Sequence, residues 1–150
     1  MDLSSDTTSV YLRHAFAGMN RVLDRLDDEQ VNVRPEGWGT NSVAGLIVHC
    51  CELSPSWFAI PGLGREGDRD RDAEFAATAT VAELRERIAV AVDLSCALAV
   101  EFAAGPTATD HPLRNFMPGS DRSDGALVLH VLEELFQHLG HMEVTADALA

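Results

Sequence analysis

The sequence predicts an all-α protein, and specifically a four-helix bundle. Four segments carry apolar residues at helical spacing, good N-cap residues precede two of them, and no segment alternates as a strand does. A chain of 150 residues has the length of one domain. Residues 1–150 are therefore expected to form a single bundle around its own core.

The first two expected helices are set by apolar spacing and by a cap. The first covers about residues 8–26, where apolar side chains recur every three or four positions. The second has Asn41 or Ser42 as its N-cap and continues to about residue 58. Pro55 lies near its end and is expected to kink the last turn or to end the helix early.

The last two expected helices flank a loop. The third begins near Thr80, where Glu83 follows at the spacing of a capping box, and Gly105–Pro106 ends it. Residues 107–124 are rich in Pro, Gly, Asp and Ser and are expected to be a loop. The fourth helix fills the remainder of the chain.

The connection between the second and third helices, residues 61–72, is long, charged and rich in glycine. Its arginines, Arg65, Arg69 and Arg71, alternate with aspartates, which favours a solvated, self-neutralising loop. Long connections are often functional and would lie at the bundle ends, where a cavity mouth could form. Trp38 and Trp57 are expected to pack near such a mouth.

Composition excludes several functions and partners. Hydrophobic residues make up 46% of the chain, as in ordinary globular proteins, and the formal net charge is −13. All 11 basic residues are arginine, and the acidic excess argues against binding to nucleic acid or to an anionic membrane. The start resembles no signal peptide, and no run approaches the roughly 20 apolar residues of a membrane span. Three cysteines, an odd number without a Cys-x-x-Cys pair, favour a reducing cytoplasm.

The fourth expected helix carries the most informative pattern. His130, Glu134, His138 and His141 return to one side of a helix, and imidazoles with a carboxylate are the ingredients of a metal site. The natural completing ligand is His49, which interrupts an apolar run in the second helix. For the strip on the fourth helix, pattern alone favours a metal site and a satisfied polar boundary equally. For His49 taken alone, it favours a core histidine that is satisfied by an ordinary hydrogen bond.

The residues Trp38-Gly-Thr-Asn-Ser-Val-Ala-Gly-Leu-Ile-Val-His49 and Leu129-His-Val-Leu-Glu-Glu-Leu-Phe-Gln-His-Leu-Gly-His141 carry a family resemblance. In order, separation and helical setting, the chain resembles the DinB-like superfamily. This superfamily includes thiol-dependent S-transferases and the amino-terminal domain of mycothiol-dependent maleylpyruvate isomerase.

The resemblance implies a set of roles. It makes His49, Glu134 and His138 metal ligands, takes His141 as the catalytic residue lining the cavity, and leaves His130 as a reserve ligand. Relatives often carry arginines near the positions that Gly125 and Ala146 occupy here. An anion-binding role of such arginines therefore does not transfer to this chain.

The implied ligand set suits a particular chemistry. Two imidazoles and one carboxylate fit Zn²⁺ first and Ni²⁺ second, with an open position for a thiol such as mycothiol. The expected function is a metal-dependent S-transferase or thiol-assisted isomerase acting on a small electrophile. Three alternatives stay open: a metallohydrolase using activated water, a non-catalytic metal or small-molecule binder, and a metal-free polar strip at a dimer interface. A homodimer is expected on general grounds.

Overall fold

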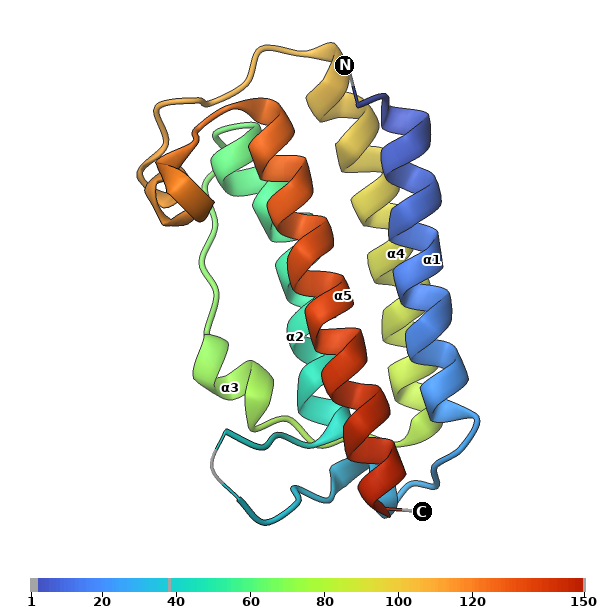
Figure 1. The fold of residues 1–150 in the computed structure, drawn as a ribbon. Coiled ribbons are helices and arrows are strands. Elements are labelled where there is room, and N and C mark those ends of the chain that lie inside the picture. Colours follow the sequence, from blue (N-terminus) through green and yellow to red (C-terminus); the bar gives the residue numbers. More distant parts are fainter. Residues whose placement is uncertain (1–2, 38, 150) are drawn as a thin grey trace.

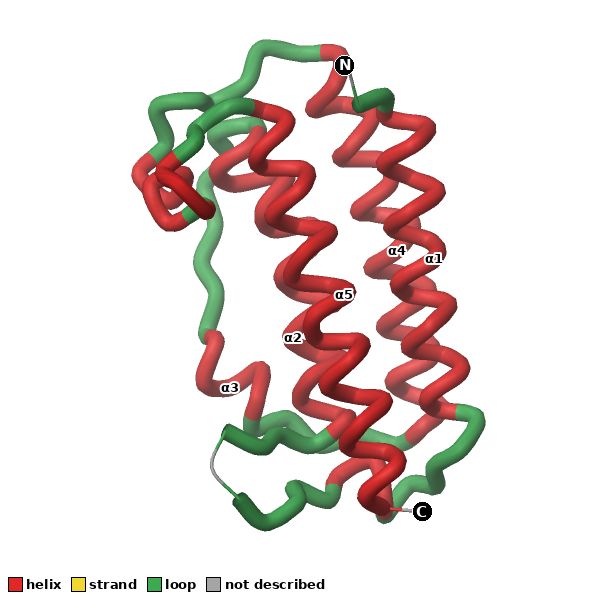
Figure 2. Tube along the Cα trace, viewed as in Figure 1, coloured by secondary structure: helices red, strands yellow, loops and turns green. Residues whose placement is uncertain are grey.

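The computed structural model describes residues 3–37 and 39–149, and its long helices lie side by side (Figure 1). These helices are α1 (Ser5–Leu23), α2 (Val43–Trp57), α4 (Val81–Ala104) and α5 (Asp124–Leu149). Every regular element in the described ranges is helical, as Figure 2 shows. The predicted all-α four-helix bundle is thus confirmed. Trp38, with its expected packing position, lies outside the described residues.

The helices form two diagonal pairs. α1 packs against α4 and α5, and α2 packs against the same two helices from the other side. In Figure 1, α1 and α5 run downward while α2 and α4 run upward. The connection from α2 to α4 must therefore return along the whole bundle. It carries a short helix, α3 (Arg71–Phe75), which packs against α2.

The observed caps explain the helix starts. α1 begins earlier than expected, at Ser5, because the Ser4 hydroxyl accepts a hydrogen bond from the Thr7 N–H at 3.1 Å. Ser42, one of the two predicted N-cap residues, caps α2 in the same way. The capping box of Thr80 and Glu83 is present at the start of α4, which confirms that prediction as well.

α2 is the most buried helix and continues beyond its proline. Pro55 lies inside α2 without ending it, and a π-helical turn, η2 (Phe58–Gly62), follows directly. Together they form a 20-residue helical run, Val43–Gly62, that is long and apolar enough to cross a membrane, so the expectation of no such run is wrong. The reason is packing: neighbours on several sides demand apolar residues nearly all round the helix, and most residues of this run are buried.

The connection from α4 to α5 is pinned by a fully buried arginine. Two short 3₁₀ turns interrupt this connection, which the sequence analysis expects to be a plain loop. Arg114 donates from Nε to the Pro61 carbonyl at 2.8 Å and from Nη1 to the Arg122 carbonyl at 2.8 Å. Its Nη1 also pairs with Asp124 Oδ1 at 2.8 Å. The connection is thereby tied to the end of η2 and to the first residue of α5.

Candidate metal centre

Three of the predicted ligands meet between α2 and α5. His49 comes from the middle of α2, and Glu134 and His138 lie one turn apart on α5. One ligand atom from each residue can be chosen so that all three lie within 4.8 Å of one another. The α-helical spacing of four residues places the two α5 side chains on one face, as the sequence predicts. The structure therefore brings together the three residues for which a metal-binding role is expected.

The two histidines leave unpaired nitrogens in this cluster. His49 Nε2 is buried and has no hydrogen-bond partner, and His138 Nε2, also buried, makes no well-formed hydrogen bond although the Glu134 carboxylate lies close to it. An unpaired polar atom in such a place costs about 1–3 kcal/mol, so a missing partner is implied. A cation would supply that partner for both nitrogens.

The spacing on α5 also fits a tetrahedral ion. His138 Nε2 lies 3.3 Å from Glu134 Oε2. Two ligands at zinc bond lengths on a tetrahedral centre are about 3.3 Å apart. The neighbouring His138 lowers the pKa of the Glu134 carboxyl, against the opposing effect of burial, so the carboxylate form is available at neutral pH.

The ring nitrogen of His49 that lies away from the ligand cluster contacts the carboxylate of Glu74, a residue that no sequence pattern indicates. This nitrogen, Nδ1, lies 2.8 Å from Glu74 Oε2, and both side chains are buried. Arg69 in turn donates two hydrogen bonds to Glu74, from Nε at 2.9 Å and from Nη2 at 2.7 Å. Burial lowers the pKa of His49 to about 4, because it outweighs the opposing effect of the Glu74 hydrogen bond. The His49 imidazole is therefore neutral at pH 7, as a metal ligand must be.

The α2–α4 connection delivers Glu74 to this place. Asp70 caps the five-residue helix α3, and Phe75 stacks on the His49 ring with centroids 4.3 Å apart and an interplanar angle of 22°. α3 approaches α2 closely because Gly45 has no side chain. A Cβ at Gly45 would lie 2.4 Å from the Phe75 carbonyl oxygen. The expectation of a fully solvated 61–72 loop is thus wrong for Arg69, which joins the cluster through Glu74.

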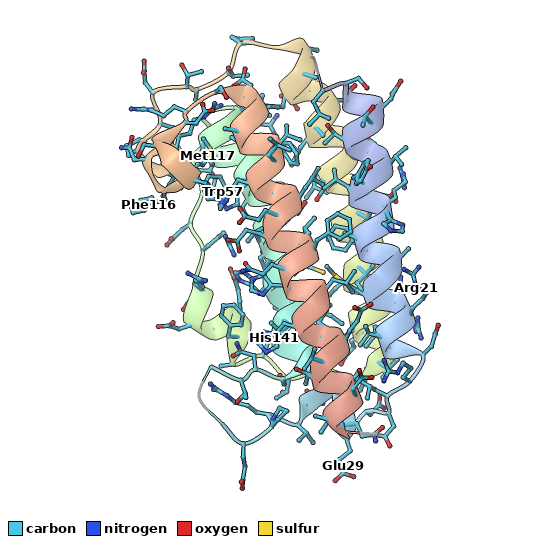
Figure 3. The ribbon with its side chains drawn as sticks, in the orientation of Figure 1. Arg21, Glu29, Trp57, Phe116, Met117 and His141 are labelled. Atoms are coloured by element: carbon cyan, nitrogen blue, oxygen red, sulfur yellow. The ribbon has the colours of Figure 1, made fainter. Side chains whose placement is uncertain are left out.

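The remaining histidines of α5 lie on the same side of the helix but outside the three-residue cluster. His141 is partly buried. Its pKa is lowered mainly by this burial and to a smaller extent by the nearby His138. Figure 3 shows His141 on the edge of α5 toward α3, and Trp57 near the other end of the bundle. His130, the reserve ligand, packs edge-on against Trp57 at a centroid distance of 4.4 Å. Its ring therefore makes an aromatic contact and lies outside the ligand cluster.

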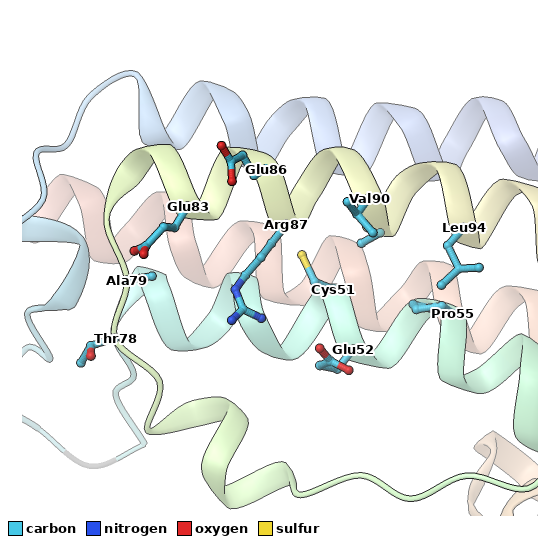
Figure 4. Close-up of a pocket in the computed structure, with 11 residues that line it drawn as sticks. Cys51, Glu52, Pro55, Thr78, Ala79, Glu83, Glu86, Arg87, Val90 and Leu94 are labelled. Atoms are coloured by element: carbon cyan, nitrogen blue, oxygen red, sulfur yellow. The ribbon is translucent and has the colours of Figure 1, made fainter.

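The cysteines beside His49 are not ligands in this arrangement. Cys50 and Cys51 are both buried, and burial raises the pKa of Cys51 to about 12 and that of Cys50 well above its usual value. Cys51 faces a different hollow, a groove of about 550 Å³ between α2 and α4 that also contains Arg87 (Figure 4). Both thiols are therefore protonated at neutral pH, as expected for small buried residues.

A wider groove of about 830 Å³ runs along the outer face of α5. It is lined largely by apolar side chains, including Tyr11, Leu129 and Phe136, and His130 lies at its edge. Neither this groove nor the one between α2 and α4 is lined by a residue of the His49–Glu134–His138 cluster. The exposed fractions of the Glu134 and His138 side chains, 23% and 14%, mark where solvent reaches the cluster.

Comparison with known proteins agrees with this geometry. A sequence profile of the Mycothiol-S-transferase family matches residues 7–149, which include His49, Glu134, His138 and His141. The curated proteins and the solved structures that were compared contain no match to the chain. The match spans nearly the whole bundle, which also agrees with the DinB-like resemblance of the sequence. The chain therefore belongs to the mycothiol-S-transferase family of DinB-like proteins.

Proposed function

We propose that the protein is a metal-dependent S-transferase that joins the sulfur of a low-molecular-weight thiol, such as mycothiol, to a small electrophile. The observation that carries this proposal is the convergence of His49, Glu134 and His138 with two unpaired buried nitrogens. It occurs in a chain whose family is named for thiol transfer.

The three ligands would hold one divalent cation. Two neutral imidazoles and one carboxylate suit Zn²⁺ first and Ni²⁺ second. When bound there, such a cation supplies Lewis acidity that favours the deprotonated, nucleophilic form of a thiol at neutral pH. His49, Glu134 and His138 together carry a single negative charge, so a divalent cation held by them would keep a net positive charge that would stabilise a thiolate.

His141 is the proposed catalytic base. Its lowered pKa leaves the imidazole neutral at pH 7, so its ring can accept the proton that the thiol loses. In transfer by substitution, an S–C bond forms while the bond from that carbon to its leaving group breaks. In transfer by addition to an unsaturated carbonyl compound, the carbon–carbon π bond breaks instead, and the proton taken from the thiol is delivered to the neighbouring carbon. In a thiol-assisted isomerisation, the sulfur instead adds to a carbon–carbon double bond and departs after rotation, so that no group is lost.

A non-catalytic metal-binding role is the second candidate. The two large grooves are not lined by the ligand cluster, and His49 is only 1% exposed, so solvent reaches the centre only past the partly exposed Glu134 and His138. Such a protein would bind the metal through the same three residues without consuming thiol. Metal binding alone therefore cannot separate the two candidates, whereas turnover can.

The decisive test is thiol consumption by zinc-loaded protein. Mycothiol would be mixed with a panel of electrophiles, such as activated aryl chlorides and unsaturated carbonyl compounds, and both thiol loss and product would be followed. We expect wild-type turnover, with His141→Ala retaining the metal and losing about 10²-fold or more in rate. His14→Ala, which changes an exposed histidine on α1, is the matched control and should behave as wild type. Full zinc occupancy without turnover on any electrophile would favour the non-catalytic role.

A further inference from the structure

The buried carboxylate of Glu74, from the α2–α4 connection, contacts the His49 ring on the side away from the ligand cluster. We infer that Glu74 is a positioning residue, which fixes the tautomer and orientation of His49 for metal binding, and that Arg69 holds Glu74 in place. This inference rests on the proposed metal centre. It adds two residues that touch neither the expected ligand atoms nor a substrate.

The hydrogen bond defines which nitrogen is free. Two groups contact His49 Nδ1: Glu74 Oε2 at 2.8 Å, which can only accept a hydrogen bond, and Arg69 Nη2 at 3.4 Å, which can only donate one. The shorter contact to the carboxylate favours the proton on Nδ1. The lone pair of the neutral ring is then on Nε2. This is the buried atom of His49 that lacks a partner and belongs to the ligand cluster. Metal-binding histidines commonly carry such a carboxylate on their other nitrogen, which orients the ring and raises its basicity.

Arg69 satisfies the other demands of Glu74. Its Nε donates to Oε1 and its Nη2 donates to Oε2, so the guanidinium binds the carboxylate in a bidentate arrangement. Glu74 is only 6% exposed and would be a costly buried charge without this partner. The pair is neutral overall. Within the cluster of described residues, the negative charge of Glu74 is thus balanced by Arg69, and Glu134 supplies the carboxylate among the three expected ligands.

Packing holds the ring against rotation. Phe75, next to Glu74 in α3, stacks on the His49 ring, and Gly45 admits the α3 backbone against α2. The ring is therefore fixed by a stacking contact on its face and by a hydrogen bond at its edge. Pre-orientation of this kind favours metal binding because less rotational freedom is lost when the ion enters.

The first test is the tautomer of His49 in metal-free protein. Long-range ¹H–¹⁵N correlation spectra of histidine-labelled wild type at neutral pH report which ring nitrogen carries the proton. We expect His49 to be protonated on Nδ1, and addition of Zn²⁺ to shift Nε2 while the Nδ1 proton is retained. A proton on Nε2 would overturn the inference. Because this measurement uses wild-type protein, its outcome does not depend on whether a variant folds.

The second test is zinc affinity by competition with a chelator. Glu74→Gln keeps the shape of the side chain but removes its charge, and we expect zinc to bind about 10–100-fold more weakly. Asp72→Asn makes the same kind of change on an exposed side chain of α3 and should alter the affinity less than twofold. Circular dichroism confirms that each variant is folded.

The outcomes separate this inference from the function on which it rests. Wild-type zinc affinity in folded Glu74→Gln would overturn the positioning role and leave the metal centre intact. A wild type that binds no Zn²⁺ at all would overturn both. Weaker binding in Glu74→Gln alone, together with the Nδ1 proton in wild type, would support the inference.

Discussion

At the scale of single residues, the centre depends on a histidine that is buried and yet neutral. His49 is 1% exposed, and burial lowers its pKa to about 4, compared with 6.5 for an unperturbed histidine. The unfolded chain therefore takes up this proton first as the pH falls. The resulting stability is fully present above about pH 6.5 and is lost progressively toward pH 4.

This linkage gives a prediction for metal-free protein. Because the difference spans about 2.5 pKa units, His49 should contribute about 3 kcal/mol to the loss of unfolding free energy between pH 6.5 and pH 4. Urea unfolding at several pH values would measure it, with His49→Gln as the comparison. We expect a shallower acid-side slope in the variant than in wild type. Parallel slopes would show that His49 does not titrate as its burial requires.

At the scale of elements, Gly45 governs how closely α3 approaches α2. Gly45→Ala would place a Cβ 2.4 Å from the Phe75 carbonyl oxygen, so α3 must move away from His49. Overpacking of this kind costs about 1–3 kcal/mol, and the shift should also weaken zinc binding because Glu74 moves with α3. Gly140→Ala is the matched control, since a Cβ there meets nothing within 4 Å. It should stabilise α5 by roughly 0.5–1 kcal/mol. Equal thermal stability of the two variants would contradict the close-approach argument.

The elements also show what the sequence can and cannot predict. The long helices follow from apolar spacing and from local caps such as Ser42 and the Thr80–Glu83 box, because those signals act within a few residues. α3 has only five residues, too few for a periodic pattern, and its place depends on packing against Gly45. The spacing of Glu134 and His138 can be recognised in the sequence because a single helix carries both residues. Glu74 is a single acid 25 residues from His49, and no spacing rule connects the two.

At the scale of the whole molecule, the proposed metal centre joins three elements that are distant in the chain. His49 lies on α2, Glu134 and His138 lie on α5, and Glu74 reaches the site from α3. A metal bound to the native arrangement alone adds its binding free energy to folding, so a chelator should lower the melting temperature. The homodimer and the cytoplasmic location stay predictions. An exposed apolar face around Tyr11 and Leu129 is available for a partner.

The central claim, a metal centre built from His49, Glu134 and His138, is tested most directly by the metal content of untagged protein. Inductively coupled plasma mass spectrometry would compare wild type, Glu134→Ala and Glu133→Ala, the last being an exposed neighbour on the same helix. We expect about one equivalent of zinc or nickel in wild type and in Glu133→Ala, and its loss in Glu134→Ala. A metal-free wild type that cannot be reconstituted, or full occupancy in Glu134→Ala, would contradict it.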